Sequence, residues 1–169
     1  ALGDVEESAD LLRWNANEVE QNEGFRTPMH SLGSPGEYYD VLRPYGVWAV
    51  ISPFNFPMAL AAGPSSAALV AGNTVVFKPA HMGVFTGLKL YEIYIAAGVP
   101  KGVFHFLSGP GSVVGDEIVN HPDVAGITFT GSYEVGMGIY KGFAKDFPKP
   151  VICEMGGKNP TIVTDKADL

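Results

Sequence analysis

Five polar or glycine-containing segments follow the apolar runs of this sequence, and they hold the residues best suited to chemistry. The segments are residues 52–57, 78–81, 108–112, 130–132 and 154–158. Among them, an amide can donate to an oxyanion, and a carboxylate can remove a proton from water. A Lys, a hydroxyl and glycine N–H groups can bind ribose or phosphate oxygens. Together the segments predict a ligand site.

Asn55 and Glu154 are the candidates for catalysis. Asn55 lies between two Phe residues and before Pro57. Such a rigid apolar turn can present the amide to an oxyanion, although Asn is also a common turn residue. Glu154 follows the apolar residues 151–153, and it suits either a general base or an ion pair with Lys158. The residues alone leave both pairs of alternatives open.

Lys78, Ser132 and two glycines are the candidates for ligand binding. Lys78 is either the solvated end of an apolar strand or a ligand of ribose or phosphate. Ser132 either caps a helix or helps to bind an anion at that helix N-terminus. Gly109 and Gly111 do not complete the dinucleotide-binding glycine fingerprint, because its third position is Val114. They equally fit a tight strand-to-helix turn.

Cys153 is the single cysteine of the chain. Its side chain and that of adjacent Glu154 should lie on opposite faces of a strand, and a small buried thiol is a better interpretation than a nucleophile. One cysteine excludes an intrachain disulfide and fits a reducing compartment. The four histidines share no metal-ligand spacing, so we predict no metal site.

The composition indicates a folded protein and argues against nucleic-acid and membrane partners. The 169 residues are 46% hydrophobic and 17% charged, which supports one packed core of ordinary size. The net charge of −7 arises in residues 1–40, and without a basic patch we expect no nucleic-acid partner. Pro57, Pro64 and Gly72 interrupt the best apolar run, so we expect no membrane partner. Neither end carries a targeting or closing signal, and we expect both to be cut points in a longer chain.

The first 45 residues are predicted to stand apart from the rest. An amphipathic helix over residues 2–20 is indicated by apolar positions spaced three and four apart, namely Leu2, Val5, Ala9, Leu12, Ala16 and Val19. Most of the acidic side chains then form a solvated helix face. We expect a loop over residues 24–36 and an extended arm over residues 37–43.

From residue 46, strands and helices alternate with short connections. Strands are predicted at residues 47–51, 74–77, 103–107, 125–129, 151–153 and 161–163. Helices are predicted at residues 57–71, 84–97, 112–120 and 133–145, the first of them kinked or split at Pro64. This alternation predicts an α/β fold with a Rossmann-like open parallel sheet and flanking helices, here incomplete. We place the domain boundary between residues 1–40 and 41–169. The five polar segments would then share the carboxyl edge of the sheet.

In this order the segments resemble the aldehyde dehydrogenase superfamily across residues 41–169. Residues 52–57 look like its Pro-aromatic-Asn-Phe-Pro segment, whose Asn helps to form the oxyanion hole. Residues 72–80 resemble the strand whose Lys contacts the adenosine ribose or its phosphate, and residues 129–136 the segment that receives the cofactor diphosphate. Residues 154–160 are similar to the Glu-Leu-Gly-Gly-Lys signature, whose Glu is the general base.

The resemblance implies an aldehyde substrate, NAD or NADP as cofactor, and Asn55 and Glu154 as catalytic residues. The stretch 43–62 looks most like 1-pyrroline-5-carboxylate (glutamate semialdehyde) dehydrogenases, which implies a role in proline catabolism and a cytoplasmic location. By the same resemblance, the arm at residues 37–45 belongs to the inter-subunit part of the family fold, which implies a homo-oligomeric parent enzyme. The residues implied for cofactor binding are Ser52, Phe54, Lys78, His81, Gly109, Gly111, Phe129, Gly131, Ser132, Val135 and Met155.

Two departures from the family pattern matter. His81 stands where many members place a Glu that binds the ribose hydroxyls, which leaves NAD versus NADP open. The nucleophilic Cys of the family follows the base by a few dozen positions, whereas only residues 155–169 follow Glu154 here. We therefore expect the nucleophile outside this chain and no dehydrogenase activity from the chain alone. The alternative is a non-catalytic nucleotide-binding module or half of a split protein.

Overall fold

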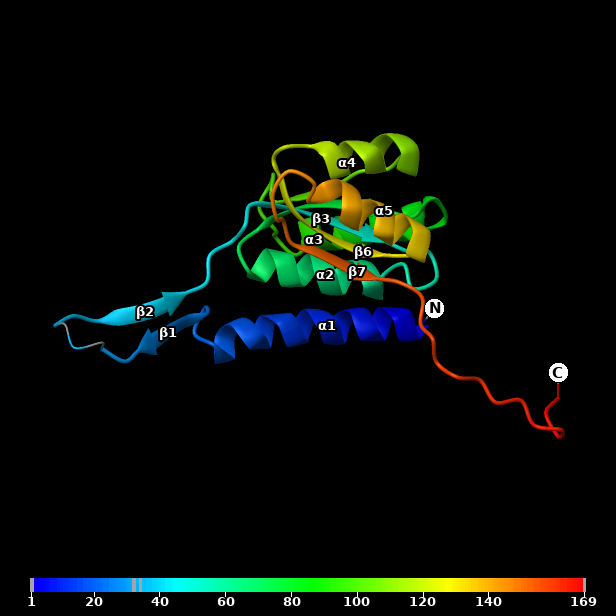
Figure 1. Ribbon diagram of the computed structural model, residues 1–169, viewed down its shortest axis with the longest axis horizontal. Coiled ribbons are helices and arrows are strands. Elements are labelled where there is room, and N and C mark those ends of the chain that lie inside the picture. Colours follow the sequence, from blue (N-terminus) through cyan, green and yellow to red (C-terminus); the bar gives the residue numbers. More distant parts are fainter. Residues whose placement is uncertain (1, 32, 34, 169) are drawn as a thin grey trace.

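A five-stranded, all-parallel sheet forms the centre of the computed structural model, which describes residues 2–31, 33 and 35–168 (Figure 1). The sheet order is β5-β4-β3-β6-β7. Its strands are β3 (Val47–Ser52), β4 (Thr74–Pro79), β5 (Phe104–Phe106), β6 (Val124–Thr130) and β7 (Val151–Glu154). The connecting helices are α2 (Ala59–Val70), α3 (Val84–Ala96), α4 (Asp116–Asn120) and α5 (Tyr133–Phe143). The predicted α/β class and open parallel sheet are confirmed.

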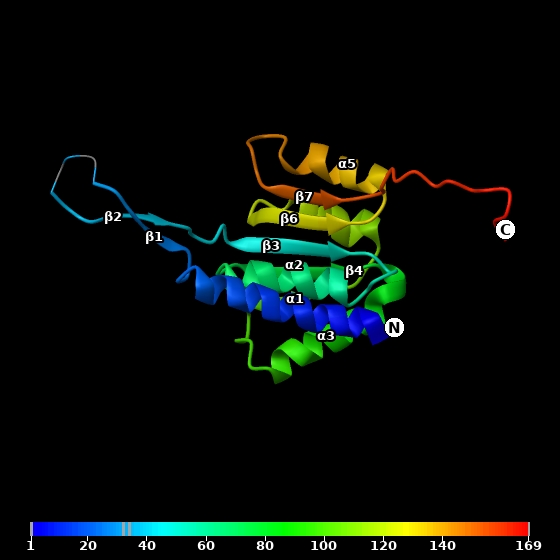
Figure 2. The same cartoon turned by 90° about the horizontal axis from the view of Figure 1, so that it is seen from below.

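Helices cover both faces of the sheet (Figure 2). The alternation of side chains along β3 separates two cores. Trp48 and Val50 pack in one core with residues of α2 and α3. Ala49 packs in the other core with Ile139 of α5, and Ile51 lies against that second core. The central strand is thus covered on both sides, as its continuous apolar run predicts.

The strand order reverses between β3 and β6. From β3 the chain builds outward through β4 to β5, and it then returns to place β6 and β7 on the other side. Such a reversal leaves a crevice outside the carboxyl ends of the two central strands, where open α/β sheets bind ligands. The register pairs Ile51 with Phe129 and Thr130 with Glu154, so these strand ends lie level at one edge.

The N-terminal helix α1 (Leu2–Gln21) packs against α2 through only part of the predicted apolar stripe, since Leu12 packs against the core. Leu2 and Val5 are exposed, whereas Ser8 is buried. Close approach of the two helices explains the difference, because α1 meets small residues of α2. A side chain at Gly63 would lie 2.9 Å from Cδ1 of Leu11, so the contact uses Leu11 and Ser8 beside Leu12, and the first members of the predicted stripe stay outside it.

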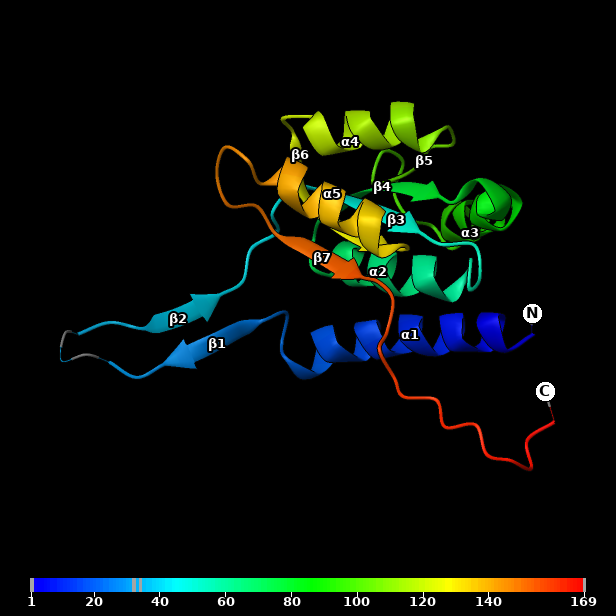
Figure 3. The same cartoon turned by 45° about the vertical axis from the view of Figure 1, so that its right-hand side comes forward.

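A two-stranded antiparallel hairpin extends away from the sheet (Figure 3). It consists of β1 (Arg26–Met29) and β2 (Tyr38–Val41). The extended arm is confirmed in β2, but the loop predicted over residues 24–36 is wrong at residues 26–29. Pairing with β2 overrides the local loop signal, and the guanidinium of Arg26 stacks on the ring of Tyr39 at 3.6 Å. The domain boundary near residue 40 stays a prediction.

Two further predictions are wrong. Residues 161–163 form no strand, because this segment runs away from the sheet and gains no partner strand among the described residues (Figure 3). The second is the split at Pro64, because α2 continues from Ala59 to Val70, and a kink there stays a prediction. The carbonyl of Gly63 beside it accepts hydrogen bonds from Nδ2 of Asn15 and Oγ of Ser66. Within the described residues, no helix combines the length and apolar character needed to cross a membrane.

Candidate functional site

The carboxyl edge of the sheet divides the predicted site residues between its two faces. Lys78, Ile51, Phe129 and Cys153 form one row across β4, β3, β6 and β7. This row faces the core that contains α4 and α5. The next row includes Ser52, paired with Pro79, and Glu154, paired with Thr130, and faces the side of α1 and α2. Lys78 and Glu154 thus lie on opposite faces of one edge, and Ser52 lies on the face of Glu154.

Lys78 is buried, with 7% of its surface exposed. The alternative of a solvated strand end is therefore wrong. Its Nζ donates one long hydrogen bond of 3.4 Å, to the adjacent carbonyl of Pro79, and neither ion pair among the described residues includes it. Burial lowers the pKa of the Lys78 ammonium. A buried cation without an anionic partner is costly, so this group suits an electronegative ligand.

Ser52 ends β3 and pairs with Pro79 of the neighbouring strand, with 2% of its surface exposed. Its Oγ is buried and makes no hydrogen bond in the part of the chain that the structure describes. Buried hydroxyls are normally paired, and an unpaired one calls for an explanation such as a ligand. Phe54, two residues further on, is 57% exposed, which leaves its ring available to a bound molecule.

The segment from Phe129 to α5 is built around glycines. Ser132 caps α5, because its Oγ accepts a hydrogen bond of 3.4 Å from the N–H of Val135. A side chain at Gly131 would lie 2.5 Å from the buried ring of Phe129. One at Gly136 would lie 2.5 Å from Sδ of Met155. The N-terminus of α5 therefore lies against the sheet edge, where its free N–H groups can meet an anion.

The loop after β3 lies against the turn after β4. A side chain at Gly83 would meet Cβ of Pro57 at 3.4 Å and the carbonyl of Pro53 at 3.7 Å. Asn55 lies in this loop and His81 begins the neighbouring 3₁₀ turn, and both residues are exposed. The two exits are therefore brought together, with the amide and the imidazole on the surface.

The exit of β5 is the outermost predicted segment on this side of the sheet. The N–H of Leu107 donates to the carbonyl of Phe77, which continues the pairing with β4. A side chain at Gly109 would lie 2.5 Å from Cγ2 of Val114, whereas Gly111 has open space around it. Gly109 is thus required by the turn, and its role in ligand binding stays a prediction.

Glu154 and Cys153 differ in their surroundings. Glu154 is exposed at the end of β7 and forms no ion pair with Lys158, so the ion-pair alternative is wrong. The Cys153 thiol is half-buried and lies 3.5 Å from the carbonyl of Gly136. Burial raises the pKa of the Cys153 thiol, which reduces its thiolate fraction at neutral pH. The carboxylate is the accessible group.

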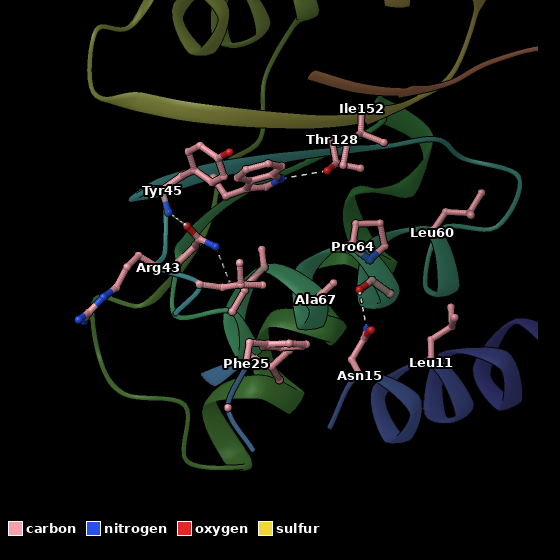
Figure 4. A pocket seen from close by; sticks show the side chains of 18 of the residues that line it. Leu11, Asn15, Phe25, Arg43, Tyr45, Leu60, Pro64, Ala67, Thr128 and Ile152 are labelled. Carbon is pink, nitrogen blue, oxygen red and sulfur yellow. Dashed lines mark hydrogen bonds between the residues drawn. The ribbon is translucent and has the colours of Figure 1, made fainter. Parts of the chain in front are cut away.

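A groove of about 930 Å³ lies elsewhere, between α1, α2 and the sheet (Figure 4). Thr128 and Ile152 form its sheet side, and Leu11 and Asn15 of α1 lie opposite (Figure 4). None of the predicted site residues lines it. The groove lies below the carboxyl edge and on the face opposite Lys78, so it is separate from the candidate site.

Asp4 was not found by sequence reasoning. Its carboxylate accepts hydrogen bonds from the N–H groups of Met58 and Ala59, at 3.2 and 2.8 Å. The contact spans more than fifty positions and joins the first turn of α1 to the start of α2. No sequence spacing could reveal it, because Asp4 lies among the acids of a solvated helix face.

The fold and the ordered strand exits define a nucleotide-binding α/β domain, and the family comparison agrees. The family model described as the aldehyde dehydrogenase family matches residues 1–169. The chain therefore belongs to the aldehyde dehydrogenase family.

Among curated proteins, the chain is similar to 1-pyrroline-5-carboxylate dehydrogenases. That of Bacillus cytotoxicus is 49% identical over 131 residues, covering 75% of this chain and 25% of the relative. That of Anoxybacillus flavithermus is 41% identical over 176 residues, covering 100% of this chain and 33% of the relative. The chain thus spans a quarter to a third of the length of these curated relatives.

Two solved structures show the same arrangement. The first is the NADP-dependent glyceraldehyde-3-phosphate dehydrogenase of Bacillus halodurans complexed with NADP, with a TM-score of 0.84 and 41% identity. The match covers 98% of this chain and 35% of that one. The second is proline utilization A of Bdellovibrio bacteriovorus, with a TM-score of 0.84 and 40% identity over 92% of this chain and 16% of that one.

Proposed function

We propose that this chain is the cofactor-binding part of an NAD(P)-dependent dehydrogenase that oxidises glutamate semialdehyde, the open form of 1-pyrroline-5-carboxylate, to glutamate. Membership of the aldehyde dehydrogenase family and the named relatives support this substrate class. The observation that carries the proposal is Lys78, a buried cation without an anionic partner at the carboxyl edge of a doubly wound sheet. The parent enzyme would be a cytoplasmic homo-oligomer.

The residues at the sheet edge fit a dinucleotide. Lys78 would donate to the ribose hydroxyls or to a phosphate on them. Ser52 stays a proposed cofactor contact, although its unpaired Oγ lies on the opposite face of this edge from Lys78. The N-terminus of α5 at Ser132 would receive the diphosphate. Small residues at Gly131 and Gly136 keep this helix end close to Phe129 and Met155. When bound, the nicotinamide would accept the hydride that leaves the aldehyde carbon.

Asn55 and Glu154 would serve the substrate. As the family resemblance implies, a cysteine outside this chain attacks the aldehyde carbon. The Asn55 amide would donate to the oxyanion that this attack creates, which is a large term in acyl chemistry. Glu154, exposed at the end of β7, would take a proton from the water that hydrolyses the resulting thioester. Its exposure leaves water free to reach it.

The cofactor choice depends on His81. A carboxylate at this position would repel a 2′-phosphate, whereas an imidazole would not. His81 is exposed in the turn after Lys78, within reach of a ligand at this edge. We therefore propose that the enzyme accepts NADP as well as NAD.

The test is an assay of the full-length enzyme that contains this chain. We expect oxidation of glutamate semialdehyde with NAD⁺ or NADP⁺, and slower oxidation of glyceraldehyde 3-phosphate. Preference for the phosphorylated aldehyde would reject the substrate assignment. Dinucleotide binding without oxidation of either aldehyde would favour the alternative, a non-catalytic nucleotide-binding module or half of a split protein.

A further inference from the structure

The carboxylate of Asp4, a residue of α1, caps the N-terminus of α2. The first N–H groups of a helix have no partner within it. Met58, at the N-cap of α2, provides no side-chain cap. Asp4 supplies both missing acceptors, since Oδ2 accepts from Met58 N–H and Oδ1 from Ala59 N–H. A negative group at a helix N-terminus also interacts favourably with the helix dipole.

The capped position lies directly after the loop that carries Asn55. Residues 53–57 begin beside Ser52, whose carbonyl accepts from the N–H of Ala80, and they end at the N–H groups held by Asp4. The side chain of Asn55 makes no hydrogen bond within the described residues, and the residue is exposed. The loop backbone therefore sets where this side chain starts, and no contact among the described residues holds the amide itself.

Asp4 itself is held in place on α1. Its backbone carbonyl accepts a hydrogen bond of 2.6 Å from Oγ of Ser8, which is 4% exposed. Further along, Nδ2 of Asn15 donates to Oγ of Ser66 at 2.7 Å. The Ser8 contact lies within α1, and the Asn15 contact joins α1 to α2. The Asp4 carboxylate is half-buried, and each of its two oxygens accepts from one backbone N–H. In Asp4→Asn, the amide NH₂ group would replace one of these oxygens and face an N–H donor.

We propose that Asp4 is a positioning residue for Asn55, holding the loop so that the amide meets the reacting carbonyl oxygen. This inference rests on the proposed function. Small displacements of an oxyanion donor cost rate rather than cofactor affinity. Loss of Asp4 should therefore lower kcat while the KM for the dinucleotide stays constant.

The test compares Asp4→Asn, Asn55→Ala and the double variant in the full-length enzyme. The matched control is Asp10→Asn, which changes the same charge on the same helix at a position that is exposed and paired only with Arg13. We expect Asn55→Ala to lower kcat about 10²–10³-fold and Asp4→Asn to lower it about tenfold. The double variant should equal Asn55→Ala alone, because Asp4 acts through Asn55.

Multiplicative effects of the two substitutions, or equal effects of Asp4→Asn and Asp10→Asn, would overturn the inference. Amide hydrogen exchange over residues 53–59 provides an activity-independent readout. Asp4→Asn should accelerate exchange in this segment about tenfold or more, whereas Asp10→Asn should not. If the wild-type enzyme oxidises no aldehyde, the proposed function fails. Independently of activity, unchanged exchange over residues 53–59 in Asp4→Asn would show that Asp4 does not hold the loop.

Discussion

Cys153 and Glu154 are consecutive residues of β7 whose side chains lie on opposite faces of the sheet. The Cys153 sulfur lies against the carbonyl of Gly136 in α5, whereas Glu154 is exposed on the face of Ile152. Adjacent nucleophilic and basic side chains would suggest a catalytic pair in a sequence. The pleat of the strand separates them, so a thioester formed on Cys153 would lie on the face opposite the water that Glu154 activates.

This geometry predicts different results for the two residues. In the full-length enzyme, Glu154→Gln should lower kcat about 10²–10⁴-fold, because the general base is lost. Cys153→Ala should change kcat less than about twofold, since the thiol only packs against α5. Steady-state assays with saturating aldehyde and dinucleotide measure both. If Cys153→Ala is as inactive as Glu154→Gln, Cys153 is the nucleophile. The proposal that the nucleophilic cysteine lies outside this chain would then be wrong.

Lys78 should oppose folding at neutral pH and favour cofactor binding. We expect Lys78→Met to unfold at higher urea concentration at pH 7, with a gain of about 1 kcal/mol, because a buried cation without a partner is removed. The same substitution should weaken NADP⁺ binding about tenfold or more, since a charge-assisted hydrogen bond is lost. Lys101→Met, at an exposed turn, is the control and should alter neither quantity. Stronger binding in Lys78→Met would contradict the assignment.

The stability of the wild type relative to Lys78→Met should depend on pH. Burial lowers the pKa of Lys78 in the folded state below the ordinary value of 10.5. Between these two values the unfolded chain binds more protons, so stability increases with pH in this window. The difference in unfolding free energy between the two proteins should therefore shrink as the pH rises through the folded-state pKa of Lys78. Urea titrations from neutral pH to about 10 measure this trend, and a growing difference would refute the burial argument.

His81 should influence which dinucleotide binds. His81→Glu places a carboxylate beside the expected position of the 2′-phosphate, and repulsion should raise the Kd for NADP⁺ more than that for NAD⁺. We expect a change of about tenfold in the ratio of the two constants, measured by fluorescence titration. His30→Glu, in the hairpin region away from the sheet, should leave the ratio unchanged. An unchanged ratio in His81→Glu would remove this residue from the site.

Two glycines of α5 provide a matched pair. An Ala at Gly138 has open space and should stabilise the helix by roughly 0.5–1 kcal/mol. An Ala at Gly136 would lie 2.5 Å from Sδ of Met155 and 3.1 Å from Cε1 of Phe129. It should destabilise the fold by about 1–3 kcal/mol and displace two residues proposed to bind the cofactor. Thermal unfolding of both variants tests the pair. Equal gains in stability would show that α5 is not held closely against the sheet edge.

Local pattern predicted most of the α/β part of the fold. The apolar runs around Val50 and Ile127 and the glycines that follow α2 and α3 define elements by short-range chemistry, and the structure contains them. The errors occur where long-range packing decides. Arg26–Met29 forms a strand only because β2 lies beside it, and Ser8 is buried only because α2 approaches closely.

The candidate site was predictable to the level of strand exits, but not to the level of faces or partners. Sequence order placed Lys78 and Glu154 at the end of strands, and the parallel register brings those ends to one edge. It could not show that Lys78 is buried without a counterion, since that depends on packing around β4. Nor could it connect Asp4 to the loop after β3, because the contact joins two separate helices.

We propose above all that the carboxyl edge of this sheet binds a nicotinamide dinucleotide. Amide hydrogen exchange of the full-length enzyme, with and without saturating NADP⁺ or NAD⁺, tests it most directly. We predict slower exchange at the exits of β3 and β4 and at the N-terminus of α5, in residues 52–57, 78–83 and 130–136. Protection confined to α1, α2 and the groove beside Trp48, with these three segments unchanged, would show that the dinucleotide does not bind at the carboxyl edge.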